Sequence, residues 1–352
     1  MALSLNRATL TRQHLITRAA LDPLTCVEHL VGMQSQNPEP PYTGLWSRLV
    51  DFTPDQLSTL IADRTLVRLL LMRGTIHLVS ARDAHGLRTL VQPVLDRGFA
   101  SILTIPKSEL PAILDAATEH LTDTALTAVE LAALLGPRFP HHDPMALATA
   151  ARAHLPLVQV PPRGLWGKKG PAAHTLATTW IGPPTTPAPT LDDLVLRYLA
   201  AFGPATPADA QAWSGLTGLR ELFDRLGLWH TEHDGRTHFD LPDAPRPHPD
   251  TPAPARYLTG FDNLLLSPAD GTRVITDDHR RAVITKNGIV HPTILIDGHV
   301  AGTWRTTTAR ARTTLTVTPF APLTRADRDA LTAEGHALLA ALAPDTSHDV
   351  QV

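Results

Sequence analysis

Hydrophobic positions in the N-terminal part of the chain recur with the spacing of helices and then change to the pattern of strands. Apolar residues follow the 3.6-residue helical period in four segments, residues 11–21, 23–34, 43–52 and 53–64. The fourth segment begins with Thr53 as an N-cap and Pro54 at the first helical position. Residues 65–80 are rich in β-formers and break at Arg73–Gly74, which predicts two strands. Several helices followed by a hairpin is the order of a winged-helix motif.

The same order recurs twice further along the chain. In the second copy, three helical segments precede two strands around a Gly/Lys-rich tip, at residues 108–121, 127–136, 143–155 and 157–181. In the third copy, three helical segments precede a hairpin, at residues 191–203, 206–215, 217–229 and 230–241. The last helix of this copy has a buried face formed by Leu219, Leu222, Phe223 and Leu226. Proline-rich breaks at residues 182–190 and 242–254 flank the third copy.

The C-terminal part changes to short β-rich runs with tight turns. Asn-Gly and Asp-Gly turns punctuate residues 283–305, and an amphipathic helix is predicted over residues 325–343. We therefore predict an α+β fold of three tandem winged-helix motifs followed by a small β-barrel-like unit with a terminal helix. The predicted domains are residues 1–105, 106–189, 190–252 and 253–352.

Composition indicates a globular protein and removes several kinds of chemistry. Of 352 residues, 43% are hydrophobic and 18% charged, and neither a membrane-spanning apolar run nor a signal-peptide core is present. A single cysteine, Cys26, excludes a disulfide framework and a thiolate zinc site within one chain. The 18 histidines lack metal-ligand spacing, and "GLWGKKG" lacks the spacing of a phosphate-binding loop. We expect a cytoplasmic monomer without membrane contact, metal or cofactor.

The basic residues gather in two stretches that contain no acid, although the formal net charge is −3. Between Asp143 and Asp192 the charged residues are Arg152, Arg163, Lys168 and Lys169. From Gly298 to Thr324 they are Arg305, Arg310 and Arg312, interleaved with threonines. Cationic and hydroxyl side chains both donate hydrogen bonds to phosphate oxygens. We therefore predict that DNA is contacted by Lys168, Lys169, Arg305, Arg310 and Arg312. The alternative is that these charges protect exposed strand edges.

Four stretches together resemble the winged-helix bacterial DNA glycosylases typified by AlkZ. They are "GMQSQNPEPPYTGLWSRL", "RGTIHLV", "FDNLLLSPADGTRVIT" and "GIVHPTILIDGHVAGTWR", and the resemblance covers nearly the whole chain. It implies a C-shaped DNA cradle, with Gln34 and Gln36 as the catalytic motif of the Gln-x-Gln branch; the other branch has Gln-x-Asp. One departure is "LTGFDNLLL", where the family more often has a proline after the first leucine and an acid at Asn263. This departure puts little of the catalysis in doubt, because the segment is not the glutamine site.

Two uncharged amides suit one kind of glycosidic hydrolysis. Alkylation at N7 of guanine or N3 of adenine makes the base cationic, so its departure needs no acid, and a well-placed water suffices. In a helix Gln34 and Gln36 would diverge by about 200°, so we expect the helix to break at "NPEPP". The alternative is that both amides only bond free carbonyls at a helix end. Candidate supporting residues are Asn37, Tyr42, Arg73 and His77; a missed acid would be Glu39 or His77.

The sequence thus favours a monofunctional DNA glycosylase that acts on cationic alkylated purines in double-stranded DNA. The resemblance leaves open whether N7-alkylguanine, bulky adducts or interstrand crosslinks are the substrates, and whether the role is self-resistance to a DNA-alkylating natural product. The alternatives are a non-catalytic winged-helix protein that binds DNA or regulates, and a protein-interaction scaffold. A scaffold should bind DNA without steep salt dependence, whereas several phosphate contacts impose one.

Overall fold

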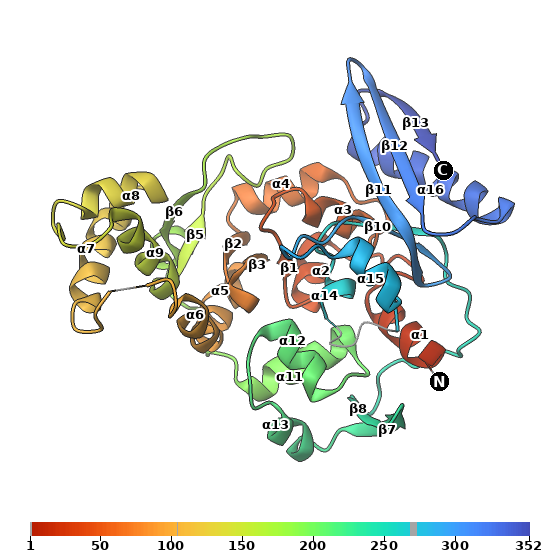
Figure 1. The fold of residues 1–352 in the computed structure, drawn as a ribbon, viewed down its shortest axis with the longest axis horizontal. Coiled ribbons are helices and arrows are strands. Elements are labelled where there is room, and N and C mark those ends of the chain that lie inside the picture. Colours follow the sequence, from red (N-terminus) through yellow and green to blue (C-terminus); the bar gives the residue numbers. More distant parts are fainter. Residues whose placement is uncertain (1, 104, 268–272) are drawn as a thin grey trace.

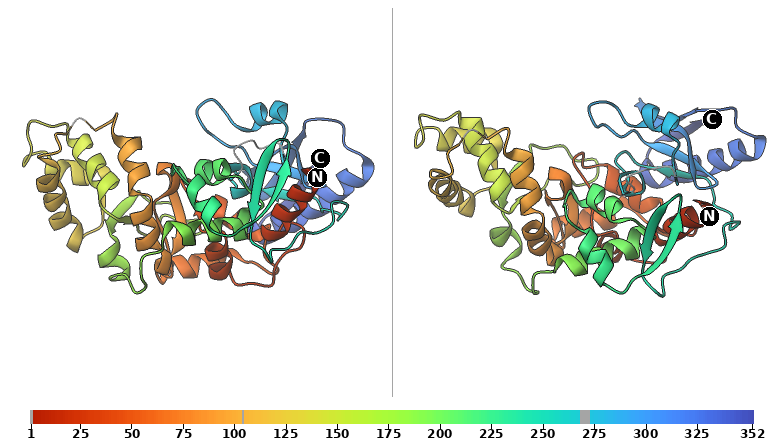
Figure 2. Two further views of the ribbon diagram at one scale, coloured as in Figure 1. Left: turned by 90° about the horizontal axis from the view of Figure 1, so that it is seen from below. Right: turned by 60° about the horizontal axis from the view of Figure 1, so that its bottom comes forward.

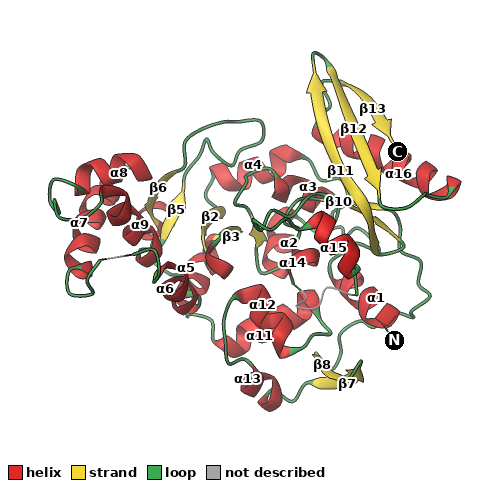
Figure 3. Ribbon diagram, viewed as in Figure 1, coloured by secondary structure: helices red, strands yellow, loops and turns green. Residues whose placement is uncertain are grey.

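The structure, a computed structural model, describes residues 2–103, 105–267 and 273–352. Helices and strands alternate along an elongated molecule (Figure 1), with helices α7 to α9 at one end and the C-terminal sheet at the other. Both views in Figure 2 show the same separation of these two ends. The described strands form three sheets, which Figure 3 shows in yellow. Within the described part of the chain, no helix is long and apolar enough to cross a membrane.

The first group of elements follows the N-terminal helix α1 (Ala2–Arg12). Its members are α2 (Pro23–His29), β1 (Met33–Gln34), α3 (Pro40–Trp46), α4 (Pro54–Ala62), β2 (Leu66–Leu70), the 3₁₀ turn η1 (Met72–Gly74) and β3 (Ile76–Ser80). The predicted strand pair is confirmed, and so is Thr53 as the N-cap of α4, where it forms a capping box with Gln56.

Three predicted helix ranges in this group are wrong. Residues 11–21 are not a helix, because α1 ends at Arg12 and His14 adopts a left-handed φ of 56°. The helix predicted over 23–34 ends at His29, because Val31 and Gly32 have φ values of 54° and 96°. The helix predicted over 43–52 is displaced to Pro40–Trp46, since proline fits the first turn of a helix and begins it.

The second group has the predicted helices and strands and two additional helices before it. The additional helices are α5 (Ala81–Leu90) and α6 (Gln92–Phe99). The group itself comprises α7 (Leu110–Asp123), β4 (Leu126–Thr127), α8 (Ala128–Leu135), α9 (Pro144–His154), β5 (Leu157–Gln159), β6 (Ala173–Leu176) and the short α10 (Ala177–Ile181). The strands β5 and β6 flank the Gly/Lys-rich tip, as predicted.

The third group matches its predicted order of elements. It comprises α11 (Leu191–Phe202), α12 (Pro207–Ser214), α13 (Arg220–Arg225), β7 (Trp229–His233) and β8 (Arg236–Asp240). The predicted buried face is confirmed: Leu219 and Phe223 are buried, and Leu222 and Leu226 pack against the same core.

One topology is common to the three groups. Each runs helix, short extended segment, two helices and hairpin, and the short segment pairs with the second hairpin strand. The pairs are β1 with β3, β4 with β6, and Ala205 with Phe239 of β8. The repeat seen in the sequence is therefore also a repeat of strand pairing.

The first two groups share one six-stranded sheet, with the order β1-β3-β2-β5-β6-β4. Strands β2 and β5 join the groups by the antiparallel pairs Arg68–Gln159 and Leu69–Val158. Leu69 and Val158 pack with residues of α11 and α12, whereas Leu66 and Leu78 pack with α2 to α4 on the opposite face. The glutamine motif lies at one edge of this sheet.

The C-terminal unit is an open sheet rather than a barrel. Its order is β13-β12-β11-β10-β9, formed by β9 (Arg256–Leu258), β10 (Thr293–Ile296), β11 (His299–Ala309), β12 (Arg312–Pro319) and β13 (Ser347–Gln351). The barrel-like prediction is wrong because β9 and β13 are edges that do not pair with each other in the described structure. The short helices α14 (Asn263–Leu266) and α15 (Asp277–Val283) precede β10.

The predicted terminal helix is present as α16 (Arg325–Leu342), but it is followed by β13, which pairs in parallel with β12. The predicted Asp297–Gly298 turn connects β10 to β11. The predicted Asn-Gly turn lies between Ile284 and Val290, which pair as an isolated antiparallel β-bridge.

Candidate active site

The strand that carries the glutamines follows a sharp turn after α2. Gly32 has a φ of 96°, and a Cβ at this position would lie 2.6 Å from Val79 Cγ1. Asn263 Nδ2 donates a 2.8 Å hydrogen bond to the Gly32 carbonyl. The segment around Asn263 therefore contacts the turn that leads to the glutamines, although it holds neither of them. Part of the same resembling stretch, residues 268–272, lies outside the described residues.

The two glutamines lie in and just after a short strand rather than at the end of a helix. Gln34 pairs with His77, and the Ser35 amide continues the ladder by donating to the Ile76 carbonyl at 2.7 Å. Successive side chains along an extended strand point to opposite faces, so Gln34 lies on one face and Ser35 on the other. Gln36 stands in the bend that follows β1, where its side-chain oxygen accepts a hydrogen bond from the Ile76 amide. The expectation that a helix break at "NPEPP" aligns them is wrong, because α2 has already ended at His29.

Both amide oxygens are held by the η1 turn and the start of β3. Gln34 Oε1 accepts a 2.8 Å hydrogen bond from Arg73 Nη2, and Gln36 Oε1 accepts a 3.0 Å bond from the Ile76 amide. Gln34 is 6% exposed, whereas Gln36 is exposed. Neither amide nitrogen has a hydrogen bond within the described part of the chain, so the donors are available to a ligand.

Arg73 and His77, both predicted as supporting residues, adjoin Gln34. Arg73 has a left-handed φ of 55° and also donates to the Trp213 carbonyl. Burial lowers the pKa of Arg73 to about 10, so it remains cationic at neutral pH. Burial, followed by the charge of Arg73, lowers the pKa of His77 to about 3. A neutral histidine with this pKa cannot serve as a general acid near neutral pH.

The strand also contacts Arg68, which the sequence analysis missed. Arg68 Nη2 donates to the Ser35 carbonyl at 2.7 Å, and its Nε donates to Ser35 Oγ at 3.0 Å. Arg68 is 1% exposed. The signal in the sequence was a charged residue in the otherwise apolar strand "LVRLL".

Asn37 and Tyr42 lie beyond the glutamines and have different surroundings. Tyr42 is buried; its hydroxyl donates to the Gly164 carbonyl at 2.7 Å, and its ring packs 4.7 Å from that of Trp166. Tyr42 therefore anchors the loop between β5 and β6. Asn37 is exposed and lines a groove of about 630 Å³ together with Trp166, Trp304 and Arg305.

The predicted DNA contacts are exposed and come from two elements. Lys168 and Lys169 lie in the loop between β5 and β6, next to Trp166 and Gly167 of the groove wall. Arg305, Arg310 and Arg312 lie on the hairpin formed by β11 and β12. Arg312 Nη2 lies 3.2 Å from Asp349 Oδ2 on β13, so its charge already has a partner. The groove thus brings the loop, Asn37 and Arg305 to one surface.

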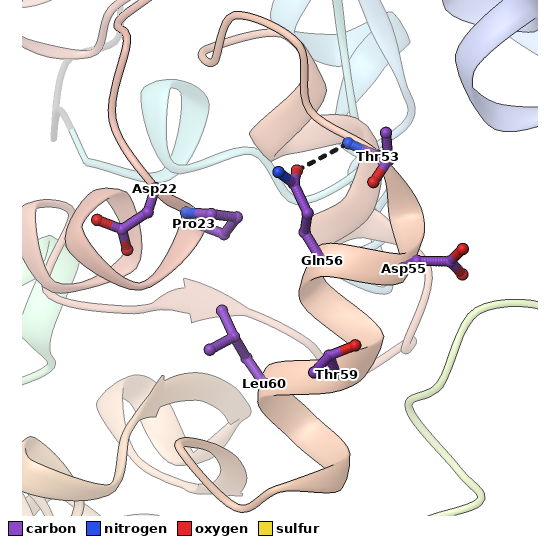
Figure 4. A pocket seen from close by; sticks show the side chains of 7 residues that line it. All are labelled: Asp22, Pro23, Thr53, Asp55, Gln56, Thr59 and Leu60. Carbon is purple, nitrogen blue, oxygen red and sulfur yellow. Dashed lines mark hydrogen bonds between the residues drawn. The ribbon is translucent and has the colours of Figure 1, made fainter.

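A second hollow, of about 420 Å³, lies between the start of α2 and α4 (Figure 4). Asp22 caps α2 through Thr25, and Gln56 Oε1 accepts a 2.9 Å bond from the Thr53 amide. These polar groups serve the helix starts, and none is a predicted site residue. Among the described residues, no cluster of three or more His, Cys, Asp or Glu side chains has the arrangement of a metal site.

Most of the chain matches one family of enzymes. Residues 27–341 match the family model described as DNA glycosylase AlkZ-like, so the chain belongs to this family and is a DNA glycosylase. Among individual proteins, it is 27% identical over 351 residues to the "Interstrand DNA cross-link repair glycosylase" of Streptomyces sahachiroi, covering 88% of each chain. The solved structure of "Streptomyces sahachiroi DNA glycosylase AlkZ" shares its fold, with a TM-score of 0.81 and 22% identity over 99% of this chain and 98% of that one.

Proposed function

We propose that this glycosylase hydrolyses the N-glycosidic bond of cationic alkylated purines in double-stranded DNA, N7-alkylguanine above all. In this proposal Gln34 and Gln36 hold the attacking water. The observation that carries the proposal is a difference between the first structural repeat and the other two, at the strand where the glutamines lie.

In the second and third repeats the short extended segment leads directly into a helix. Thr127 caps α8 in a capping box with Glu130, and Thr206 caps α12 in the same way with Asp209. In the first repeat Gln34 occupies the position that corresponds to Thr127, and α3 begins only at Pro40. The helix-capping role that this position has in the other two repeats therefore does not explain a glutamine here, and this supports a chemical role for Gln34 and Gln36.

The chemistry suits groups that neither give nor take a proton. Water attacks C1′ of the deoxyribose as the bond from C1′ to the base nitrogen breaks, and the bonding electrons neutralise the cationic base. The water's surplus proton goes to solvent, leaving an intact abasic site. Each amide can orient the water through its NH₂ group and the second lone pair of its oxygen. Hydrogen bonds from Arg73 and the Ile76 amide support this role, because they fix both amides before substrate binds.

The open surroundings of the site favour duplex DNA that carries bulky lesions. We propose that residues 1–105, 106–189 and 190–252 are winged-helix motifs that form a C-shaped cradle with residues 253–352. Lys168, Lys169, Arg305 and Arg310 would bind phosphates along it. An open cradle admits bulky adducts and interstrand crosslinks, which cannot be flipped into a closed pocket. The printed name of the Streptomyces relative supports a role in crosslink repair.

The test is base release from duplex DNA that contains a single N7-methylguanine. Enzyme in excess is incubated with the duplex, and abasic sites are cleaved by alkali and counted on a gel. We expect release by the wild type and almost none by a Gln34→Ala/Gln36→Ala double variant. Wild-type protein that binds this DNA but leaves the base in place would overturn the proposed substrate. A parallel duplex with an N7–N7 alkyl crosslink tests whether crosslinks are opened.

A further inference from the structure

Arg68 differs from most buried arginines of this protein in having no acid beside it. Arg12, Arg48, Arg256 and Arg273 are buried and pair with carboxylates, at the distances 2.6, 2.7, 3.1 and 3.5 Å respectively. In the described part of the chain Arg68 pairs with none, although it is 1% exposed. Its Nη1 is buried without any hydrogen-bond acceptor among the described residues.

Arg88 provides a structural comparison. It is also buried without an ion pair among the described residues, but its Nη2 donates to the Ala153 and Leu155 carbonyls at 2.6 and 3.4 Å. These carbonyls end helix α9, where free acceptors and the helix dipole favour a cation. The charge of Arg88 therefore stabilises a helix end, whereas Arg68, among the described residues, donates hydrogen bonds only to Ser35.

The burial of an unpaired cation is costly, and an apolar side chain of similar length would avoid that cost. Proteins retain such locally unfavourable choices mainly at functional sites. The two acceptors of Arg68 are both oxygens of Ser35, the residue between the two glutamines. Ser35 lies on the opposite face of the chain from Gln34, so Arg68 holds this segment from the side away from Gln34.

Arg68 also connects this strand to the loop that carries the lysines. It lies in the central pair of the six-stranded sheet, opposite Gln159 of β5. Gly164 covers it so closely that a Cβ there would lie 3.1 Å from Arg68 Cδ, and the φ of Gly164 is 109°. Lys168 and Lys169 follow in the same loop, which Tyr42 anchors from α3.

We propose that Arg68 is a positioning residue for base excision: by binding both oxygens of Ser35 it fixes the register of Gln34 and Gln36 and ties them to the loop at residues 161–170. This inference rests on the proposed function. When phosphates hold the loop, Arg68 transmits that placement to the strand. The residue does not touch the substrate, so it acts on the chemical step rather than on DNA affinity.

The test is Arg68→Met, which keeps the length of the side chain and removes the charge and both hydrogen bonds. We expect the single-turnover rate of N7-methylguanine release to fall by roughly tenfold to a hundredfold, the range that small misplacements of reacting groups produce. The Kd for the same DNA should stay within about twofold, and Tm should be unchanged or higher because an unpaired buried charge is gone. Arg68→Lys, which keeps one donor, should recover part of the rate.

The matched control is Arg88→Met, which should lower Tm and leave the single-turnover rate of the folded enzyme unchanged. If Arg68→Met instead lowers Tm and releases the base at the wild-type rate, Arg68 is only structural and the inference fails. If Arg68→Met does not fold, Arg68→Lys and Ser35→Ala decide together, because each removes part of the contact between Arg68 and Ser35; wild-type rates in both overturn the inference. Absence of excision by the wild type would refute the proposed function instead, so the two failures are distinguishable.

Discussion

Arg73 donates a hydrogen bond of 2.8 Å from Nη2 to the side-chain oxygen of Gln34. The same guanidinium donates to the Trp213 carbonyl near the end of α12, so one cation links the first and third repeats. Its bond to Gln34 Oε1 turns the NH₂ group of that amide away from Arg73. Arg73, which lies in the turn between β2 and β3, thus sets the orientation of the Gln34 amide before any DNA binds.

Replacement of either glutamine should slow chemistry and spare binding. Gln34→Ala or Gln36→Ala removes one group that holds the water, and loss of a comparable donor costs on the order of 10²-fold in rate. The single-turnover rate on N7-methylguanine DNA measures the chemical step, and a fluorescence anisotropy titration measures Kd. We expect Kd to change by less than about threefold, because a single amide contributes little beside the phosphate contacts.

Gln56→Ala is the matched control for these variants. Gln56 accepts the Thr53 amide hydrogen bond at the start of α4 (Figure 4), and within the described residues it makes no hydrogen bond with Gln34 or Gln36. Its loss should lower stability by about 0.5–2 kcal/mol, as for other helix caps, and leave the excision rate unchanged. A variant at position 34 or 36 that excises at the Gln56→Ala rate would remove that glutamine from the mechanism.

Local patterns were sufficient to predict most elements of the fold. The period of Leu219, Phe223 and their neighbours predicted a buried helix face, and the break at Arg73–Gly74 separated two strands, because both signals depend on residues close in sequence. The pairing of strands that lie far apart in the sequence left no such signal. The sequence did not indicate that β2 and β5 join two repeats in one sheet, or that β13 adds to β12 after the terminal helix.

The candidate site shows the same division between local and long-range information. The motif predicts Gln34 and Gln36 as the site and a helix break as the cause of their arrangement, whereas Gln34 pairs with His77 in a strand and Gln36 follows in a bend. That pairing depends on Val31 and Gly32 ending the helix with positive φ values, and a β-branched valine with such a φ is not predictable from propensity. Arg68 was missed because its role depends on Ser35, which only the folded sheet places beside it.

The hairpin arginines should differ in their contribution to DNA binding. Replacing an arginine that contacts a phosphate by alanine should reduce the magnitude of the slope of log K against log salt by roughly 1. The reduction should be the same for all DNA sequences. Arg310 lies exposed at the turn between β11 and β12, whereas Arg312 already pairs with Asp349 at 3.2 Å. We therefore expect a larger change for Arg310→Ala than for Arg312→Ala. A combined Arg305/Arg310 variant with an unaltered slope would show that these charges only protect the strand edge.

Acid should destabilise the protein through histidines whose pKa is lowered in the folded chain, and His77 and His174 are two of them. Burial lowers the pKa of His77 to about 3 and of His174 to about 4, below the ordinary 6.5. Between roughly pH 6.5 and pH 4 the unfolded chain therefore binds protons that the folded chain does not, so stability falls as pH falls. Each such histidine contributes at most about 1.4 kcal/mol per pH unit.

Urea unfolding at pH 7.5, 6 and 5 measures this dependence. His174→Gln keeps a neutral polar side chain and should flatten the slope between pH 6 and pH 5. His248→Gln, a change at an exposed histidine, is the control and should leave the slope as in the wild type. Equal slopes for the two variants would place the acid sensitivity in other groups.

The leaving-group chemistry predicts which bases are released and how the rate varies with pH. Without a general acid, the enzyme should release N7-methylguanine and N3-methyladenine, which are cationic, but not uracil or 8-oxoguanine, which are neutral. Neither glutamine titrates, and the pKa values of His77, about 3, and of Arg73, about 10, lie outside the working range. The single-turnover rate should therefore vary little from about pH 6 to pH 9.

Borohydride should trap no covalent complex, since a lyase needs an amine nucleophile that the mechanism does not include. Efficient release of uracil with a bell-shaped pH profile would contradict this scheme and make the exposed Glu39, beside the motif, the first acid to mutate.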